Sequence, residues 1–351
     1  MRYTSIDHVQ HGERLAKHIY AQDGRVLLNE GVTITVSLIA KLRNMGVTAI
    51  FIQDERFADV EIENVVSEKT KQEMLSTLAE SVKFVQEEKS LNEKAVSSVA
   101  KKLIEEVLQN QEHLVHLSDI RTEDNQLFVH CVNVCILSVL IGVQVGLSHE
   151  KLHQLAIGAL FHDIGKVVSS QQIKQPSGYN QNIADEGYDH HAWHGFQFLR
   201  RLNGISTLSA HIALTHHEHI DGSGQPRGLI GTDIHYLAKI VAVTNSYDRL
   251  VTKTGDEQSL LPYDASEKIM GLANIHYDYQ VVWRFLRSIA LYPTGSQVKL
   301  TSGEYGVVVS QHRGLPQRPI VRTFTENHKD ITFEEIDLAK HPTIFIERMI
   351  V

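Results

Sequence analysis

The sequence is poor in cysteine and in positive charge, and both deficits narrow the possible functions. The two cysteines, Cys131 and Cys135, lie one helical turn apart in an apolar run without CxxC spacing. We therefore expect buried free thiols in a protein of the reducing cytosol. The net charge of −8 argues against a nucleic-acid polymer as partner, because neutralising its phosphates needs a basic face. A small anionic ligand stays compatible, since a bound metal ion supplies its own positive charge.

Long apolar segments are also scarce. The chain begins with MRYTSIDHVQHGERL, which is polar and lacks the apolar stretch of a secretory signal. One run, residues 127–147, is long enough to span a bilayer, and further apolar helical segments follow it closely. Its polar residues are His130, Asn133, Ser138 and Gln144. We expect this run to be a buried core helix of a soluble, cytoplasmic protein without a membrane span.

The first part of the chain, residues 1–58, predicts a small α+β module with an accessory or regulatory role. Asp23-Gly24 is suited to the positive φ of a tight hairpin turn. Residues 35–45 have the apolar spacing of a helix, and Gly46 is placed to end it. The strands are expected at residues 18–20, 26–28 and 49–52.

Residues 59–118 predict a helical connector, and residues 119–292 predict a larger helical domain. Ser90 and Glu93 fit a capping box, so the connector is expected to form two helices. Its apolar residues either pack on the main domain or form the seam of a helical dimer. Residues 293–351 predict a small β subdomain. Its strands are expected at residues 298–300, 305–310, 320–324 and 343–346. The predicted fold is therefore mainly α, with a small module at each end.

Histidines and one aspartate gather in the helical part of the sequence. They are His130, the pair His162-Asp163, His191 and the pair His216-His217. Imidazole is the commonest protein ligand for transition metals, and a carboxylate is able to bridge two ions. Each histidine alone has a core or surface role as its alternative, but their joint occurrence favours a binuclear metal site. Adjacent helical side chains point about 100° apart, so each pair must lie near a helix end to face one site.

Three short motifs are specific in combination. They are HDIGK at 162–166, HAWHG at 191–195 and HHEHIDGSGQPRGL at 216–229. Together they resemble the HD-GYP family of metal-dependent cyclic di-GMP phosphodiesterases, in which His130 matches the position of the first ligand. The resemblance covers residues 120–292 and implies an α-helical HD-type bundle. It also implies metal-assisted hydrolysis of cyclic di-GMP to linear pGpG, to GMP or to both.

The resemblance also implies roles for individual residues. It implies two divalent metal ions, iron or manganese, with Asp163 as the bridge between them. The ligands would be His130, His162, Asp163, His191, His216, His217 and Asn245. Lys166 would act in catalysis beside Asp163, by neutralising the phosphate or by protonating the leaving oxygen. The cyclic dinucleotide would be bound by Asp221, Gly222, Gly224, Gln225, Pro226 and Arg227.

Three positions depart from the family's pattern. Gln225 replaces the signature tyrosine, so that the motif reads GQP. Asn245 replaces the last metal-binding aspartate, which removes one negative charge from the ligand set. Asp248, one helical turn further on, is a candidate to replace that aspartate. Gln126 stands where some members have a glutamate for a third ion, so we expect two ions.

These departures leave a second hypothesis open, a catalytically impaired sensor or scaffold that binds the dinucleotide or a signalling partner protein. The complete histidine set and Lys166 favour the enzyme, since histidines are costly to bury without partners. Hydrolysis of another phosphoester by the same metal pair is a third hypothesis. The motifs do not separate cyclic di-GMP, the expected ligand, from cyclic GMP-AMP, and a homodimer is compatible with the sequence.

Overall fold

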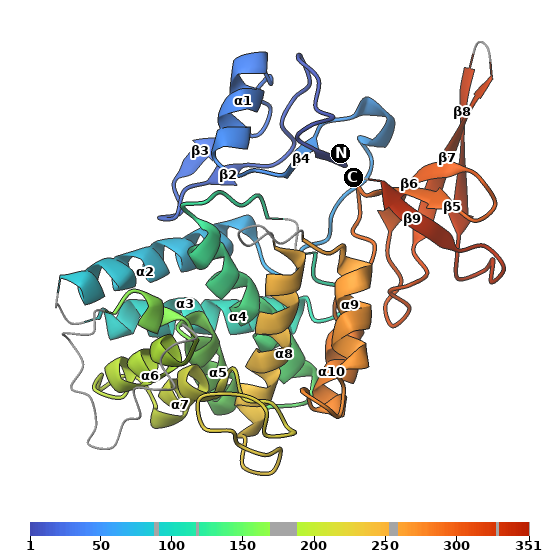
Figure 1. Ribbon diagram of the computed structural model, residues 1–351. Coiled ribbons are helices and arrows are strands. Elements are labelled where there is room, and N and C mark those ends of the chain that lie inside the picture. Colours follow the sequence, from blue (N-terminus) through green and yellow to red (C-terminus); the bar gives the residue numbers. More distant parts are fainter. Residues whose placement is uncertain (88–90, 117–118, 169–187, 253–258, 328–329, 351) are drawn as a thin grey trace.

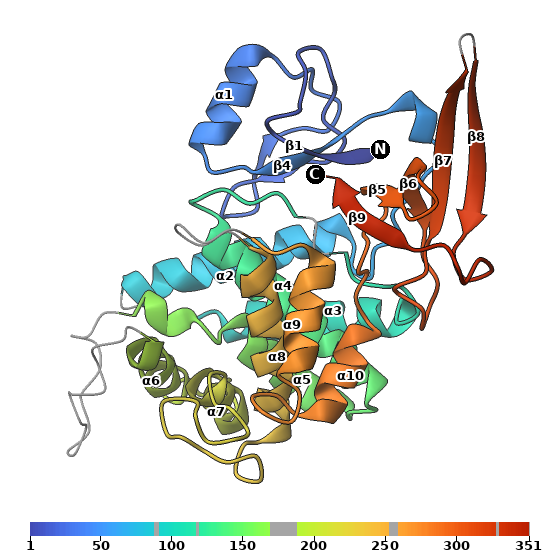
Figure 2. The same cartoon turned by 45° about the vertical axis from the view of Figure 1, so that its right-hand side comes forward.

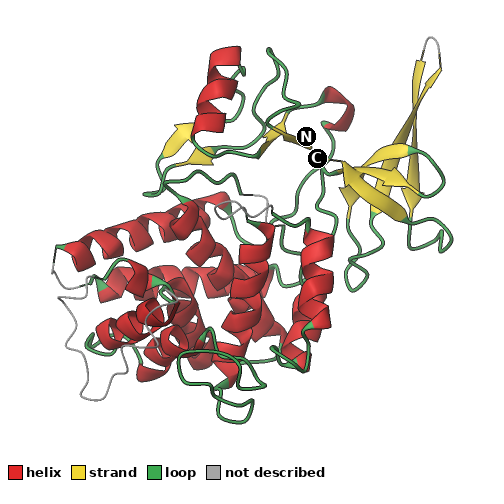
Figure 3. Ribbon diagram, in the orientation of Figure 1, coloured by secondary structure: helices red, strands yellow, loops and turns green. Residues whose placement is uncertain are grey.

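The fold consists of a helical body with two smaller parts attached to it (Figures 1 and 3). This computed structural model describes residues 1–87, 91–116, 119–168, 188–252, 259–327 and 330–350. The N-terminal α+β elements and the C-terminal sheet lie side by side at the same end of the helical body, and Figure 2 shows the two chain termini near each other. The predicted fold class, mainly α with a small module at each end, is confirmed.

The N-terminal module has its own small core. Strand β1 (Arg2–Ser5) pairs with β4 (Ala49–Ile52), and β2 (Ile19–Tyr20) pairs with β3 (Val26–Leu28), both antiparallel. Gly24 has a φ of 78° in the predicted hairpin turn. The remaining elements are helix α1 (Val36–Asn44) and the short 3-10 helix η1 (Glu55–Phe57). The buried residues of the core include Leu15, Ile19, Ile34, Ile39, Leu42 and Ile50.

Two helices follow, as predicted, and their apolar faces are buried within the chain. They are α2 (Glu68–Gln86) and α3 (Glu93–Gln109), which pack on each other and on the next helix of the body. The predicted capping box is wrong, because the N-cap residue of α3 is Asn92, whose side chain accepts a hydrogen bond from Ala95 N at 3.2 Å. Ser90, the predicted cap, lies outside the described residues.

Helix α4 (Gln126–Gln144) is the centre of the helical body. It packs against α5 (His149–Leu160) and α8 (Tyr236–Val251), and it carries the two cysteines as buried free thiols. Within the described part of the chain, α4 is the one helix long and apolar enough to cross a membrane, and 83% of that window is buried inside the fold. Its apolar surface is therefore covered by neighbouring helices.

The rest of the helical body surrounds α4 and α5. Its elements are η2 (Ile164–Lys166), α6 (Tyr188–Leu199), α7 (Thr207–Thr215), α9 (Pro262–Gly271) and α10 (Tyr279–Leu286). Helix α7 packs on α5, α6 and α8, while α9 and α10 both pack on α8 and α10 also contacts α4. This arrangement brings the C-terminal ends of α5 and α7 close to the N-terminal part of α4.

The C-terminal part is a five-stranded antiparallel sheet in the order β8-β7-β6-β5-β9. Its strands are β5 (Gln297–Leu300), β6 (Tyr305–Ser310), β7 (Ile320–Asn327), β8 (Asp330–Asp337) and β9 (Ile346–Ile350). The prediction missed β8, a charged strand at the sheet edge whose Phe333 side is exposed. The strand expected at 343–346 is wrong, since β9 begins only at Ile346. Arg318 instead donates to the Ile344 carbonyl at 2.7 Å, which holds that segment outside the ladder.

The contact between η2 and α6 leaves no room for a side chain at Gly165. A Cβ there would lie 1.8 Å from the His191 carbonyl oxygen and 2.6 Å from the Gly195 amide nitrogen, which are both backbone atoms. We predict that Gly165→Ala lowers the free energy of unfolding by about 1–3 kcal/mol, because the two elements must separate. Gly271→Ala is the matched control, since nothing lies within 4 Å of a Cβ there. Urea unfolding of both variants checks this, and equal midpoints would contradict it.

Candidate metal centre

The predicted histidines and aspartate converge on one buried cluster between α4, α5, α6 and α7. The residues that the structure brings together are His130, His162, Asp163, His191, His216 and His217. The first lies in the second turn of α4, and His191 lies in the first turn of α6. Each adjacent pair lies directly at a helix C-terminus, after α5 and after α7. At these positions both members of a pair face one site, as the sequence predicts.

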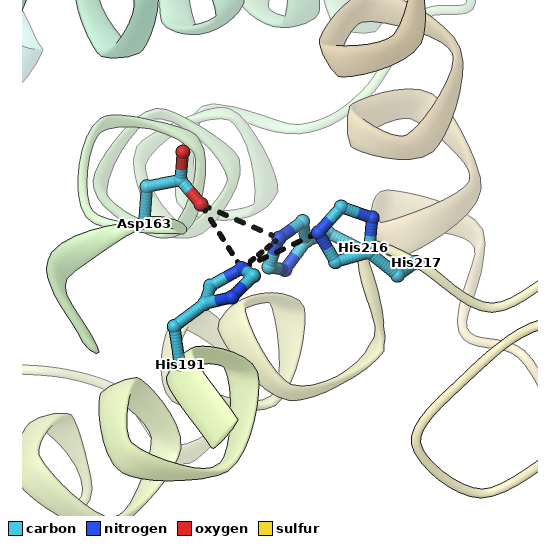
Figure 4. A group of neighbouring side chains, drawn as sticks. All are labelled: Asp163, His191, His216 and His217. Atoms are coloured by element: carbon cyan, nitrogen blue, oxygen red, sulfur yellow. Dashed lines mark hydrogen bonds and ion pairs between the residues drawn. The ribbon is translucent and has the colours of Figure 1, made fainter. Parts of the chain in front are cut away.

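Asp163 stands at the centre and presents one oxygen to each of two histidine groups. Its Oδ1 lies 3.1 Å from His191 Nε2 and 3.7 Å from His216 Nε2 (Figure 4). Its Oδ2 lies 3.5 Å from both His130 Nε2 and His162 Nε2. The cluster therefore consists of two sets of donor atoms that share a single carboxylate.

The imidazole nitrogens of each set point at one another. The Nε2 atoms of His130 and His162 are 3.2 Å apart, and His191 Nε2 lies 3.3 Å from the Nε2 atoms of both His216 and His217. Lone pairs that converge in this way repel each other unless a cation lies between them. Nitrogen and carboxylate oxygen donors are the ligands that divalent transition metals accept, so the cluster fits divalent metal binding.

Hydrogen bonds on the far side of two rings fix which nitrogen faces the cluster. His162 Nδ1 donates to the Ala159 carbonyl at 2.7 Å, and His216 Nδ1 donates to the Ala213 carbonyl at 2.8 Å. Both carbonyls belong to the last turn of a helix, where backbone acceptors lack helical partners. Since Nδ1 carries the proton in these rings, Nε2 presents a free lone pair to the cluster.

The electrostatics of the cluster keep its ligands in the form that binds metal. Burial lowers the pKa of His162 and His217 well below the usual value, and also lowers the pKa of His216. These rings are therefore neutral near pH 7. Burial by itself would raise the pKa of Asp163, but the surrounding histidines and the Lys166 ammonium outweigh this effect, and the pKa is well below its usual range. A buried anion thus faces neutral imidazoles.

Lys166 lies beside this anion. Its Nζ is 2.5 Å from Asp163 Oδ2, and 39% of its side chain is exposed to solvent. The lysine lies at the end of η2, three residues after Asp163, so the short helix holds the two groups together. The position gives the cluster one cation that is accessible from solvent.

Asp248 does not join the cluster, so the structure does not bear out its expected role as a replacement ligand. Its carboxylate instead lies behind His130, accepting a hydrogen bond from Nδ1 at 2.6 Å, and pairs with Arg121 at 2.5 and 2.9 Å. Asn245 is buried on α8 one turn before Asp248, and so shares the face that is directed to His130. Gln126 lies one turn before His130 on α4. Sequence reasoning missed Arg121, because no motif surrounds it.

The predicted nucleotide-binding loop is anchored directly behind the second histidine pair. Gln225 N donates to the His217 carbonyl at 3.1 Å. Glu218, which sequence reasoning also missed, is buried and accepts hydrogen bonds from the backbone of Arg227 and Leu229, both at 2.8 Å. The loop residues lie outside the metal cluster. They are the exposed Asp221 and Arg227, the half-buried Gly222, Gln225 and Pro226, and the buried Gly224.

Comparisons with known proteins agree with this geometry. The sequence model of the HD domain family matches residues 91–281, and that of the KOW domain associated with HD domain matches residues 297–351. A cyclic di-GMP phosphodiesterase of Pseudomonas aeruginosa is 31% identical over 241 residues, which are 67% of this chain and 57% of that protein. One of Thermotoga maritima is 35% identical over 172 residues, or 49% of this chain and 46% of that protein. The chain thus spans about half the length of these curated relatives.

Further relatives and one solved structure complete the comparison. A 3'3'-cGAMP-specific phosphodiesterase of Vibrio cholerae is 31% identical over 147 residues, which are 42% of this chain and 31% of that protein. The solved structure of an HDG"Y"P protein from Bdellovibrio bacteriovorus has the same fold, with a TM-score of 0.51 at 19% identity over 81% of this chain and 97% of that one. The chain belongs to the HD domain family, and its resemblance to the HD-GYP members of that family is confirmed.

Proposed function

We propose that this chain is a metal-dependent phosphodiesterase that hydrolyses cyclic di-GMP to linear pGpG, to GMP or to both. The main observation behind the proposal is that the two carboxylate oxygens of Asp163 face separate histidine sets. The names of the Pseudomonas and Thermotoga relatives support cyclic di-GMP as the substrate. A cytoplasmic location agrees with a messenger that is made and degraded inside the cell.

The two donor sets would hold two divalent ions. His130, His162 and Asp163 Oδ2 would hold one ion, and Asp163 Oδ1, His191, His216 and His217 would hold the other. A nitrogen-rich site with a bridging carboxylate is suited to iron or manganese. When bound, such a pair supplies polarisation of the phosphate and a lowered pKa for a coordinated water.

The chain's own groups orient the substrate and manage its charge. The Lys166 ammonium, next to Asp163 and partly exposed, would neutralise the phosphate or give a proton to the leaving ribose oxygen. Glu218 holds the backbone of the 221–229 loop against the histidine pair, so Gln225 and Arg227 would meet a bound nucleotide at the mouth of the site.

A second candidate function, binding of the dinucleotide without turnover, is favoured by the substitutions at Asn245 and Gln225. Asn245 is able to ligate through its carbonyl oxygen but brings no charge. A protein with this function would act as a sensor or as a scaffold for a signalling partner. Hydrolysis of cyclic di-GMP by the iron- or manganese-loaded chain tests the first function. Two bound metals, tight binding of the dinucleotide and no product would contradict it and support the second.

Removal of the shared carboxylate should empty both donor sets. We predict that Asp163→Ala loses at least nine tenths of the bound iron or manganese, together with all hydrolysis. The reason is that neither histidine set keeps an anionic ligand, which lowers the metal affinity by roughly tenfold or more. His211→Ala is the control, since this half-buried histidine lies on α7 beside Phe196 and outside the cluster. Elemental analysis and product chromatography check both variants. Unchanged metal content in Asp163→Ala would sink the proposed site.

Restoring the missing charge should strengthen the site. We predict that Asn245→Asp raises metal affinity by about tenfold and raises turnover, because a carboxylate attracts a divalent ion more strongly than an amide does. Asn245→Ala should lower the affinity, which separates the effect of the charge from that of the amide oxygen. Titration with Mn²⁺ against a competing chelator measures each affinity. A wild-type affinity in both variants would remove Asn245 from the ligand set.

Lys166 should act on the reaction rather than on the metals. We predict that Lys166→Gln retains both ions but lowers kcat by about 10²-fold or more, because the positioned proton donor is lost. Lys151→Gln, an exposed position on α5, is the matched control. Metal content and steady-state kinetics are measured on the same preparations, and a normal kcat in Lys166→Gln would assign the lysine a purely structural role.

A further inference from the structure

The segment that joins α3 to α4 belongs to the core of the N-terminal module. We call residues 119–125 the junction segment. Ile120 is buried in the hydrophobic cluster of the module. Two hydrogen bonds tie the same segment to the module, from Glu123 N to the Met45 carbonyl at 3.0 Å and from Asn125 Nδ2 to the Tyr20 carbonyl at 2.8 Å. In Figure 1 this part of the chain runs between the N-terminal module and the helices. Any displacement of the module must therefore move the junction segment.

The next residue of the segment, Arg121, reaches the metal cluster through one intermediate residue. Its guanidinium binds both oxygens of Asp248 on α8, with Nη1 2.9 Å from Oδ2 and Nη2 2.5 Å from Oδ1. Asp248 is completely buried, and its Oδ2 accepts the hydrogen bond from His130 Nδ1 at 2.6 Å. Only Asp248 separates the junction segment from a predicted metal ligand.

Arg121 is also fixed from the other side. With its amide oriented to satisfy both neighbours, Asn133 on α4 accepts from Arg121 Nη2 at 3.0 Å and donates to Asp119 Oδ2 at 2.9 Å. Asp119 in turn pairs with Lys71 of α2 at 2.9 Å. A continuous chain of polar contacts thus runs from α2 and the junction segment to the metal cluster.

The order of these contacts determines what Arg121 does. A carboxylate behind a ligating histidine fixes the ring and raises the basicity of the nitrogen that faces the metal. That carboxylate is buried, and the two hydrogen bonds from the Arg121 guanidinium hold it in position. Asp248 therefore depends on Arg121, and the orientation of His130 depends on Asp248.

We propose that Arg121 is a positioning residue for His130, and that the N-terminal module holds Arg121 in place through Ile120. The state of the module is thereby coupled to the metal affinity of the His130 set. This inference rests on the proposed role of His130 as a metal ligand. It gives the module a regulatory role, because a partner or ligand that shifts the module would weaken or strengthen one metal position.

The first test removes the contacts between Arg121, Asp248 and His130. In the full-length chain, Arg121→Ala and Asp248→Asn should each weaken Mn²⁺ binding at one of the two positions by about tenfold or more, with the second position unchanged. Arg322→Ala is the matched control. Arg322, in the C-terminal sheet, makes a similar bidentate contact with Asp59, at 2.8 and 2.6 Å, and lies far along the chain from Arg121. Its Mn²⁺ affinities should equal those of the wild type.

The second test destabilises the N-terminal module and leaves Arg121 and Asp248 unchanged. Ile120→Ala and Ile39→Ala both remove a buried side chain from the same cluster, with exposed fractions of 8% and 9%. Both should lower the melting temperature to a similar extent, but only Ile120→Ala should weaken Mn²⁺ binding, by several-fold. Affinities are measured well below each melting transition, so that unfolded chains do not contribute.

The outcomes separate this inference from the proposed function. Two Mn²⁺ ions bound equally well by wild type, Arg121→Ala and Asp248→Asn would overturn the inference and leave the phosphodiesterase proposal standing. An equal loss of affinity in Ile120→Ala and Ile39→Ala would overturn the route through the junction segment. A wild-type chain that binds no Mn²⁺ or iron would overturn the proposed function and this inference together.

Discussion

The structure of the site depends on one buried negative charge, the carboxylate of Asp163. A charge removed from water is costly unless other groups compensate it, and here imidazoles and the Lys166 ammonium surround it. The groups around Asp163 come from four helices, so the packing of the helical body determines the geometry of the site. To bring His191 to Asp163, η2 and α6 must approach each other closely. This close approach leaves no space for a side chain at Gly165.

The positions of the histidine pairs at helix ends allow adjacent side chains to face the same site. Two adjacent residues can face one point only where a helix stops, and both pairs lie where α5 and α7 end. The last turns also supply free carbonyls, and His162 and His216 each bind the carbonyl three residues earlier. The same repeated local structure therefore places the ring, selects its tautomer and aims Nε2 at Asp163. His130 comes from a helix interior instead, and it needs a carboxylate from a distant helix for the same purpose.

This difference explains what the sequence could predict. The histidine pairs, Lys166 and the hairpin turn at Gly24 depend on residues that are near in sequence, and the motifs and turn chemistry indicate them. Asp248 lies 118 residues from His130 and 127 from Arg121, and no local pattern reveals such a pairing. The edge strand β8 was missed for a related reason, because its charged residues suit a sheet edge but do not alternate clearly in hydrophobicity.

The commitment of Asp248 to Arg121 also bears on the substitution at Asn245. If Asp248 turned to ligate a metal, Arg121 would lose its bidentate partner and His130 would lose its support, so the missing charge is not replaced from within α8. Asp163 is then the one carboxylate among the described candidate ligands, and under the proposed function it would face two divalent ions and the Lys166 cation. Such a site would carry a large excess of positive charge. A ligand with two phosphodiester anions would compensate that excess, so the replacement of an aspartate by Asn245 would strengthen the attraction for a cyclic dinucleotide even as it weakened metal binding.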